Sequence, residues 1–201
     1  MTRLLPGILA MAAVVVASNI LVQFLFGNWL TWGAFTYPLA FLVTDITTRL
    51  YGATEGRKVV FAGFLTGVAC SFIAAGFDAT TLRIALGSGV AFLTAQLIDV
   101  SIFDRLRGGA WWRAPLASTL VGATVDTALF FTIAFSAALA FLEPGGDVTW
   151  AAEALPLLGL GPVVPLWVSL AVADWGVKIA LALLALVPFR IVVGRALRQA
   201  A

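Results

Sequence analysis

The sequence LPGILAMAAVVVASNILVQFLF, which forms residues 5–26, contains no charged residue. About 20 consecutive apolar residues are enough for an α-helix to cross the hydrocarbon core of a membrane. We therefore interpret 5–26 as a transmembrane helix. We also expect this helix to be retained, because the run is longer than the apolar core of a cleavable signal peptide.

The rest of the chain repeats this pattern. Of its 201 residues, 62% are hydrophobic and 11% are charged, whereas a water-soluble domain carries about 25% charged residues. Five further apolar runs predict helices at 31–51, 59–77, 84–103, 115–141 and 165–187. The sequence thus predicts an all-α, polytopic membrane protein in which residues 1–201 form a single domain of six transmembrane helices. Three prolines and two glycines between 155 and 166 predict a re-entrant or interfacial stretch, or a plain apolar loop.

The basic residues between the predicted helices fall almost entirely on one side. Nine of them lie at the two termini and after the second and fourth helices, and only Arg83 lies on the opposite side. Because cytoplasmic loops are enriched in Lys and Arg, this pattern predicts six crossings with both termini in the cytoplasm. The compact loops favour the inner membrane of a bacterial cell. The acidic Glu143, Asp147 and Glu153 then belong to an outer loop.

The composition also excludes several chemistries. The chain has no histidine and a single cysteine, Cys70, so histidine metal sites and Ser-His-Asp or Cys-His nucleophiles are absent. Residues 52–58 contain glycines and a lysine without the spacing of a phosphate-binding loop. We therefore expect no catalytic residue, no metal, no cofactor and no nucleic-acid partner.

Six ionisable residues lie inside the predicted helices: Asp45, Arg49, Asp99, Asp126, Asp174 and Lys178. A charge at the centre of a membrane costs roughly 2.5–3.5 kcal/mol, so these groups must be paired or hydrated. Spacing of four residues predicts two intrahelical pairs, Asp45 with Arg49 and Asp174 with Lys178. Four acids against two bases leave an excess of two negative charges. A structural lock of salt bridges between helices is the alternative interpretation.

Uncharged polar residues accompany these charges on most of the predicted helices. Asn19 and Gln23 share one face of the first helix, and Gln96 lies on the fourth. This distribution predicts a central polar cavity rather than scattered hydrogen bonds between helices.

Several long strings resemble the queuosine precursor transporters of the vitamin-uptake-like group. They are SNILVQ at 18–23, TWGAFTYPLAFLVTDITTRLYGA at 31–53, AQLIDVSIFDRLR at 95–107, WWRAPLASTLVGATVDTALFF at 111–131 and DWGVKI at 174–179. The resemblance spans nearly the whole chain, and it departs from the family pattern in a long insert at 150–165.

The resemblance implies a six-helix transporter that imports a 7-deazapurine, 7-cyano-7-deazaguanine above all, for salvage into tRNA queuosine. An ionised carboxylate, from Asp45 or Asp126, would accept the ring N–H and the exocyclic amino group of such a base. Arg49 and Lys178 would hold the carboxylates, and Asp99 and Asp174 would be structural or coupling charges. An amide would bind the carbonyl of the base, and aromatic rings would stack on it. The amide candidates are Asn19, Gln23 and Gln96, and the ring candidates are Tyr37, Phe41 and Trp175.

Three other functions are weighed against this one. A substrate-capture subunit of an ATP-driven vitamin importer would dock through an alanine face such as Ala13 and Ala17. An intramembrane enzyme could use Asp99 and Asp126, but no GxGD-like loop surrounds either acid. A purely structural protein would not need four aspartates within its helices. The lipid bilayer is the expected surrounding, and a homodimer could form through the GxxxG motif of Gly63 and Gly67.

Overall fold

The computed structural model describes residues 2–145 and 148–200, so Asp147 lies outside the described residues. Its helices are α1 (Leu5–Leu21), α2 (Gly33–Thr36), α3 (Leu39–Tyr51), α4 (Ala53–Ala75), α5 (Leu82–Leu106), α6 (Arg113–Phe135) and α7 (Leu166–Ala200). Short 3-10 helices are η1 (Thr2–Leu4), η2 (Ala137–Leu142), η3 (Thr149–Ala152) and η4 (Leu157–Gly159). Two small hairpins complete it, β1 (Leu25–Phe26) with β2 (Leu30–Thr31) and β3 (Ala154–Pro156) with β4 (Val163–Pro165). The fold is all-α, as predicted.

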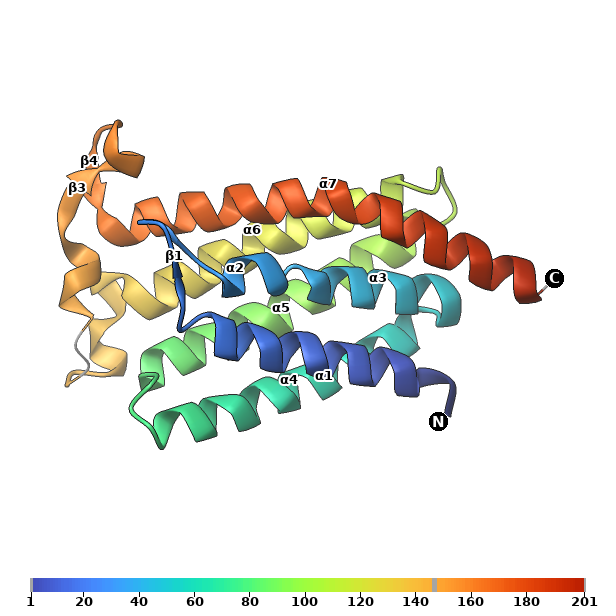
Figure 1. The fold of residues 1–201 in the computed structure, drawn as a ribbon, viewed down its shortest axis with the longest axis horizontal. Coiled ribbons are helices and arrows are strands. Elements are labelled where there is room, and N and C mark those ends of the chain that lie inside the picture. Colours follow the sequence, from blue (N-terminus) through green and yellow to red (C-terminus); the bar gives the residue numbers. More distant parts are fainter. Residues whose placement is uncertain (1, 146–147, 201) are drawn as a thin grey trace.

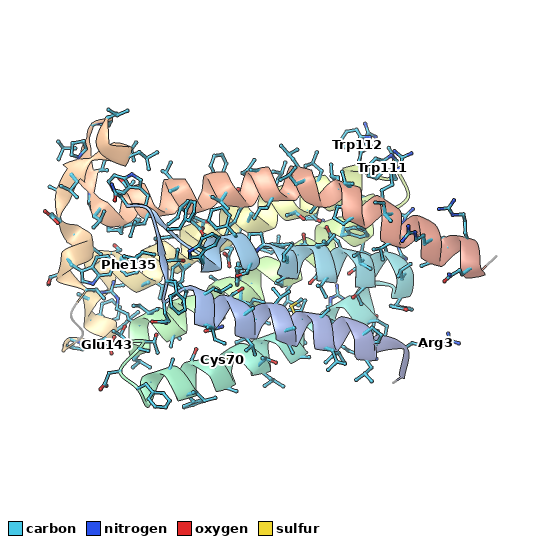
Figure 2. The ribbon with its side chains drawn as sticks, viewed as in Figure 1. Arg3, Cys70, Trp111, Trp112, Phe135 and Glu143 are labelled. Carbon is cyan, nitrogen blue, oxygen red and sulfur yellow. The ribbon has the colours of Figure 1, made fainter. Side chains whose placement is uncertain are left out.

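The helices form one elongated bundle whose two described chain ends lie at the same end (Figure 1). Figure 2 places Arg3, Trp111 and Trp112 toward that end and Glu143 toward the opposite one. The basic and acidic loops therefore separate to the two ends of the bundle as the charge pattern predicts.

Within the described residues, four helices are long and apolar enough to cross a membrane: α4, α5, α6 and α7. The helix α1 is also apolar but has only 17 residues. It ends at Leu21, whereas the sequence predicted helix up to residue 26. The chain turns there into the β1–β2 hairpin, where Gly27 adopts a φ of +66° that other residues rarely adopt.

The second predicted span is interrupted rather than continuous. The short α2 ends at Thr36, and α3 begins at Leu39 with Pro38 as its N-cap. Proline has no N–H to donate and its ring clashes with the preceding turn, so the helical hydrogen-bond ladder breaks at this point. The break lies beside the polar interior described below.

The last two predicted spans differ from the structure at their ends. The helix α6 stops at Phe135 and η2 follows, where continuous helix was predicted to residue 141. The helix α7 continues to Ala200 with Pro188 inside it, where the prediction ended at 187. The irregular stretch predicted for 155–166 is confirmed, since it holds the β3–β4 hairpin and η4.

The GxxxG motif packs α4 against α1 of the same chain. A Cβ atom added to Gly63 would lie 2.6 Å from Cγ of Met11 and 2.9 Å from Cζ of Phe92, and one added to Gly67 would lie 3.6 Å from Cγ1 of Val15. Glycine is what permits this approach. A homodimer could therefore use this face only by displacing α1.

Arg83 and Glu143 join the ends of α5 and α6 on the side opposite the termini. Arg83 is only 2% exposed, and its guanidinium donates to the carbonyls of Ile133 and Ser136 at the end of α6. The Glu143 carboxylate accepts the backbone N–H groups of Arg83 and Leu82, both at 3.0 Å. These bonds, led by the one from Arg83, hold the pKa of Glu143 below its ordinary value. The N-terminus of α5 thus receives a negative charge from Glu143, and the C-terminus of α6 receives a positive charge from Arg83, which are the charges that the unpaired backbone groups at these ends favour.

Candidate binding site

Lys178 of α7 is the centre of a buried ion-pair cluster. Its side chain is 4% exposed, and its ammonium lies 2.6 Å from Oδ2 of Asp126 and 2.5 Å from Oδ2 of Asp174. It also donates to Oγ1 of Thr127 at 3.0 Å. The predicted Asp174–Lys178 pair is confirmed, and Asp126 of α6 joins it from a second helix. We call Tyr37, Asp126, Thr127, Asp174 and Lys178 the lysine cluster.

Tyr37 brings the interrupted second helix to the lysine cluster. Its hydroxyl donates to Oδ1 of Asp126 at 2.8 Å, and the Lys178 ammonium lies 5.4 Å from the centre of its ring. Tyr37 lies between the end of α2 and Pro38. The single tyrosine of the lysine cluster is therefore located at the break in the helix. Transporter sites are typically built beside such discontinuous helices.

A second cluster surrounds Asp45 of α3 and Asp99 of α5, which are 2% and 0% exposed. Hydroxyls of Ser118 and Thr119, both on α6, donate to the two oxygens of Asp45 at 3.2 Å. Asp99 faces the same part of α6, because a Cβ atom added to Gly122, one turn after Ser118, would lie 3.4 Å from the Cβ of Asp99. We call Asp45, Asp99, Ser118 and Thr119 the carboxyl cluster.

Gln96 extends the carboxyl cluster by one turn of α5. Its Oε1 accepts a hydrogen bond of 2.6 Å from the Thr44 hydroxyl, while its Nε2 has no partner among the described residues. Within the described residues, both carboxylate oxygens of Asp99 also lack a hydrogen-bond donor. Buried polar atoms without partners are rare and call for a physical reason.

The predicted pair between Asp45 and Arg49 is wrong. The Arg49 guanidinium donates to the backbone carbonyl of Arg107, in the connection between α5 and α6. The hydroxyls of α6 occupy the Asp45 carboxylate instead. Spacing of four residues places two groups on one face but does not prevent either from finding a better partner on another element. Arg49 therefore does not compensate the charge of the buried Asp45.

Phe41 lies between the two clusters. Tyr37, Phe41 and Asp45 follow one another at four-residue spacing, and so do Asp126, Gly122 and Ser118 on the facing helix α6. A Cβ atom on Gly122 would come within 2.7 Å of Cε1 of Phe41, so the ring packs directly against this glycine. The aromatic ring thus separates the lysine cluster from the carboxyl cluster.

The polar interior is closed in this structure. A void of about 10 Å³ adjoins Asp45 and Thr119 and is otherwise lined by apolar side chains. This volume corresponds to about one water molecule. The predicted polar faces do converge, but they form a packed hydrogen-bonded interior, and a purine-sized ligand requires the helices to separate.

The remaining predicted residues lie outside both clusters. Asn19 donates to the carbonyl of Val15 one turn earlier in α1, and Gln23 is exposed in the turn after that helix. Trp175 is 43% exposed, and its indole N–H donates to Oγ1 of Thr124 at 3.0 Å. In this closed conformation its ring faces outward and not toward the ion pairs.

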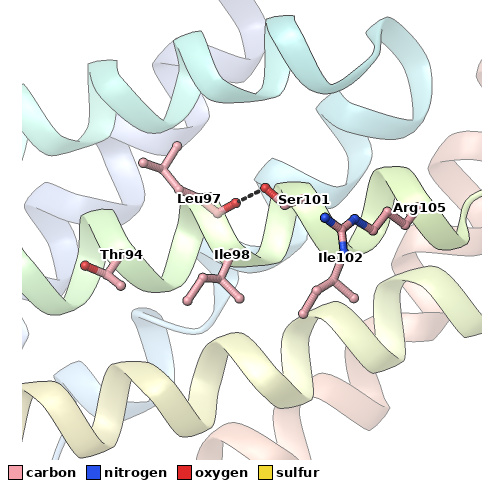
Figure 3. Close-up of a pocket in the computed structure, with 6 residues that line it drawn as sticks. All are labelled: Thr94, Leu97, Ile98, Ser101, Ile102 and Arg105. Carbon is pink, nitrogen blue, oxygen red and sulfur yellow. Dashed lines mark hydrogen bonds between the residues drawn. The ribbon is translucent and has the colours of Figure 1, made fainter.

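A surface groove on α5 is not the candidate site. It has a volume of about 420 Å³ and is lined by six residues of this one helix (Figure 3): Thr94, Leu97, Ile98, Ser101, Ile102 and Arg105. None of the buried acids contributes to it. The Ser101 hydroxyl is already bonded to the carbonyl of Leu97.

Thr127 is the cluster member that sequence reasoning missed. Its hydroxyl donates to Oδ2 of Asp174 at 2.8 Å and accepts from Lys178. The sequence signal that could have identified Thr127 is its position directly after Asp126 on α6, because a polar residue beside a buried acid can reach the same neighbouring helix. The hydroxyls of Ser118 and Thr119 were likewise not predicted as the partners of Asp45.

Apolar helices, an interrupted helix and buried ion pairs together define a multi-pass membrane protein of the transporter class. The family described as "Putative vitamin uptake transporter" matches residues 31–193. The chain belongs to this family.

Three curated relatives are similar to the chain. The "Queuosine precursor transporter" of Escherichia coli (strain K12) is 39% identical over 141 residues, which cover 61% of this chain and 64% of the relative. The "Probable queuosine precursor transporter" of Haemophilus influenzae is 38% identical over 121 residues, 52% of each chain. That of Bacillus subtilis (strain 168) is 31% identical over 134 residues, 55% of this chain and 58% of the relative. The chain thus spans between about half and just under two thirds of the length of these relatives. No solved structure matches it.

Proposed function

We propose that this protein is a membrane transporter that imports a queuosine precursor, with 7-cyano-7-deazaguanine as the preferred substrate, for salvage into tRNA queuosine. The observation that carries the proposal is the lysine cluster, a buried charged centre at the break between α2 and α3. The names of the similar proteins supply the substrate class. A purely structural bundle would gain little from two carboxylates around one ammonium, because buried ion pairs often add no stability over apolar packing.

Asp126 is the carboxylate that we assign to the base. Its two oxygens accept from the Tyr37 hydroxyl and the Lys178 ammonium, which are the donors that a bound base would replace. The ring N–H and amino group of a deazaguanine are two adjacent donors that fit a carboxylate in a bidentate way. Lys178 would keep its bond to Asp174 when Asp126 turns to the base. Phe41 and Tyr37 would supply flat faces for stacking.

We also propose six membrane crossings with both termini in the cytoplasm of a bacterial cell and the protein in its inner membrane. The shared end of the two termini (Figure 1), toward which Arg3, Trp111 and Trp112 also lie (Figure 2), supports this topology, because the basic residues occur at the termini and beside those tryptophans in the sequence. The test is labelling of single cysteines in a Cys70→Ala background with a membrane-impermeant maleimide. We expect a cysteine at Glu143 to be labelled in intact cells and one at Arg3 to be labelled only after lysis. The reverse pattern would invert the topology.

Rescue of tRNA queuosine tests the function. The chain is expressed in a bacterium that can neither make nor import deazaguanines, the medium contains a low concentration of 7-cyano-7-deazaguanine, and queuosine is measured in the tRNA. We expect restored queuosine from the native chain, a strong loss for Asp126→Asn, and native behaviour for Asp104→Asn, which changes a surface acid of α5. Absence of rescue despite membrane expression would refute the proposed substrate. Rescue that requires an added ATP-driven partner module would favour the substrate-capture alternative.

A further inference from the structure

The carboxyl cluster contains two buried acids and no base. Asp99 is fully buried, and both of its oxygens lack a hydrogen-bond donor among the described residues. The neighbouring Asp45 is 2% exposed and already accepts two hydroxyl donors. Two ionised carboxylates buried beside the same face of α6 would repel each other, and no base in the cluster compensates their charge. The arrangement therefore needs a cationic or protonic ligand.

No cation of the described chain supplies that compensation. On α3, Arg49 is turned to the carbonyl of Arg107. On α7, the side chains that face Asp45 across the small void are apolar, namely those of Ala182, Ala185, Leu186 and Phe189. The helix α1 has no ionisable residue. The other charged groups of the adjoining helices are engaged elsewhere or exposed. Arg83, the buried cation of α5, donates to the carbonyls of Ile133 and Ser136 at the far end of that helix. The remaining groups are Glu55 with Lys58, Asp104 with Arg107, Arg113 and Arg190 over tryptophan rings, Asp126 and Asp174 with Lys178, and the exposed Arg57, Arg105, Arg195 and Arg198.

We propose that Asp45 and Asp99 bind one transported proton between them and that this carrier is proton-coupled. One shared proton would join the two carboxyl groups by an O–H···O⁻ hydrogen bond and give Asp99 the partner it lacks. Ser118 and Thr119 donate to the remaining negative charge on Asp45. The proton comes from water on the side where the bundle opens and leaves to water on the other side. No covalent intermediate is required.

Both clusters have members on α6 and on the segment from Tyr37 to Asp45, which couples their exposure. Asp45 on α3 and Tyr37 before it are eight residues apart, and so are Ser118 and Asp126 on α6. Eight helical residues correspond to about 12 Å along the axis. Any movement that separates α3 from α6 breaks the contact of Phe41 with Gly122 and hydrates both clusters together. The base and the proton would then enter and leave in the same conformational step, an inference that rests on the proposed function.

The test uses the purified full chain in liposomes that contain a pH-sensitive dye, with 7-cyano-7-deazaguanine added outside. For the native protein we expect internal acidification upon substrate entry, and accumulation that approaches but does not exceed tenfold when the outside is one pH unit more acidic. Asp99→Asn should still exchange labelled for unlabelled base across the membrane, but it should neither acidify the lumen nor accumulate substrate. Asp45→Asn should behave in the same way, and it serves if Asp99→Asn is not stably folded. Asp104→Asn, on the same helix as Asp99, should match the native protein in every measurement.

The outcomes separate this inference from the proposed function. Substrate entry by the native protein without acidification would overturn the proton site and leave the transporter in place. Loss of exchange as well as accumulation in a folded Asp99→Asn would overturn it too, because Asp99 would then belong to the base site. Absence of any base movement by the native protein would refute the proposed function and the coupling together.

Discussion

Replacement of Lys178 by methionine should destabilise the protein more than any other single change in the lysine cluster. The ammonium contacts Asp126 at 2.6 Å, Asp174 at 2.5 Å and Thr127 at 3.0 Å, and its side chain is 4% exposed. Methionine keeps the length and apolar stem but leaves two buried carboxylates facing each other. Removing one partner of a buried ion pair costs about 3–5 kcal/mol. For a chain of this size that corresponds to a decrease in Tm of about 6–20 °C.

Thermal unfolding in detergent, followed by the fluorescence of the seven tryptophans, measures this decrease. Lys58→Met is the matched control, because its side chain is 59% exposed and its pair with Glu55 is worth at most about 1 kcal/mol. The triple variant Lys178→Met, Asp126→Asn, Asp174→Asn should recover much of the lost stability, since it leaves no uncompensated charge. An unchanged Tm for Lys178→Met, or a triple variant no more stable than the single one, would refute this electrostatic reasoning.

Three further predictions test the fold. Gly63→Ala should lower the free energy of unfolding by about 1–3 kcal/mol because its Cβ would overlap Met11, whereas Gly67→Ala should be neutral or slightly stabilising; thermal unfolding distinguishes the two variants. Arg49→Gln and Asp45→Asn should have additive effects on Tm, because the two side chains have separate partners. If the double variant differs from the sum of the single variants by more than about 0.5 kcal/mol in free energy of unfolding, Asp45 and Arg49 interact as the sequence predicted. Glu143→Gln should lower the free energy of unfolding at neutral pH, and the difference from the native protein should vanish on acidification. The pKa of Glu143 is lower in the folded than in the unfolded protein. The stabilisation by its carboxylate is therefore present above the unfolded pKa and is lost as the pH falls through the folded pKa. A difference that persists at low pH would show that the carboxylate charge is not what stabilises this junction.

The sequence alone was sufficient to predict an all-α fold and the separation of the basic and acidic loops to opposite ends of the bundle. Long apolar runs and the sorting of basic residues are set by transfer to lipid, which acts on each segment almost independently of its neighbours. Helix ends were less predictable. The break at Pro38 was invisible to a hydropathy count because proline is tolerated in membrane helices when neighbouring groups satisfy the backbone. The continuation of α7 through Pro188 shows the opposite outcome for the same residue type.

The site was predictable as a set of residue types but not as a set of partners. Lys178 and Asp174 pair as their spacing indicates, because both face the same interior and Asp126 reinforces them. Asp45 and Arg49 have the same spacing and do not pair, because α6 offers hydroxyls to the acid and the α5–α6 connection offers a carbonyl to the base. Such choices depend on which helices become neighbours, and spacing within one helix contains no information about that.

The unequal helix lengths have a consequence for the surrounding lipid. At 1.5 Å per residue, α1 is about 26 Å long and α3 about 20 Å, whereas α7 is about 52 Å. A hydrocarbon core of about 30 Å would have to become thinner beside the short helices. The last turns of α7, which carry Arg190, Arg195 and Arg198, would extend to the headgroups. Lipids with shorter acyl chains relieve this mismatch, so we expect the thickness of the host membrane to set how readily the bundle opens on the side of α1 and α3.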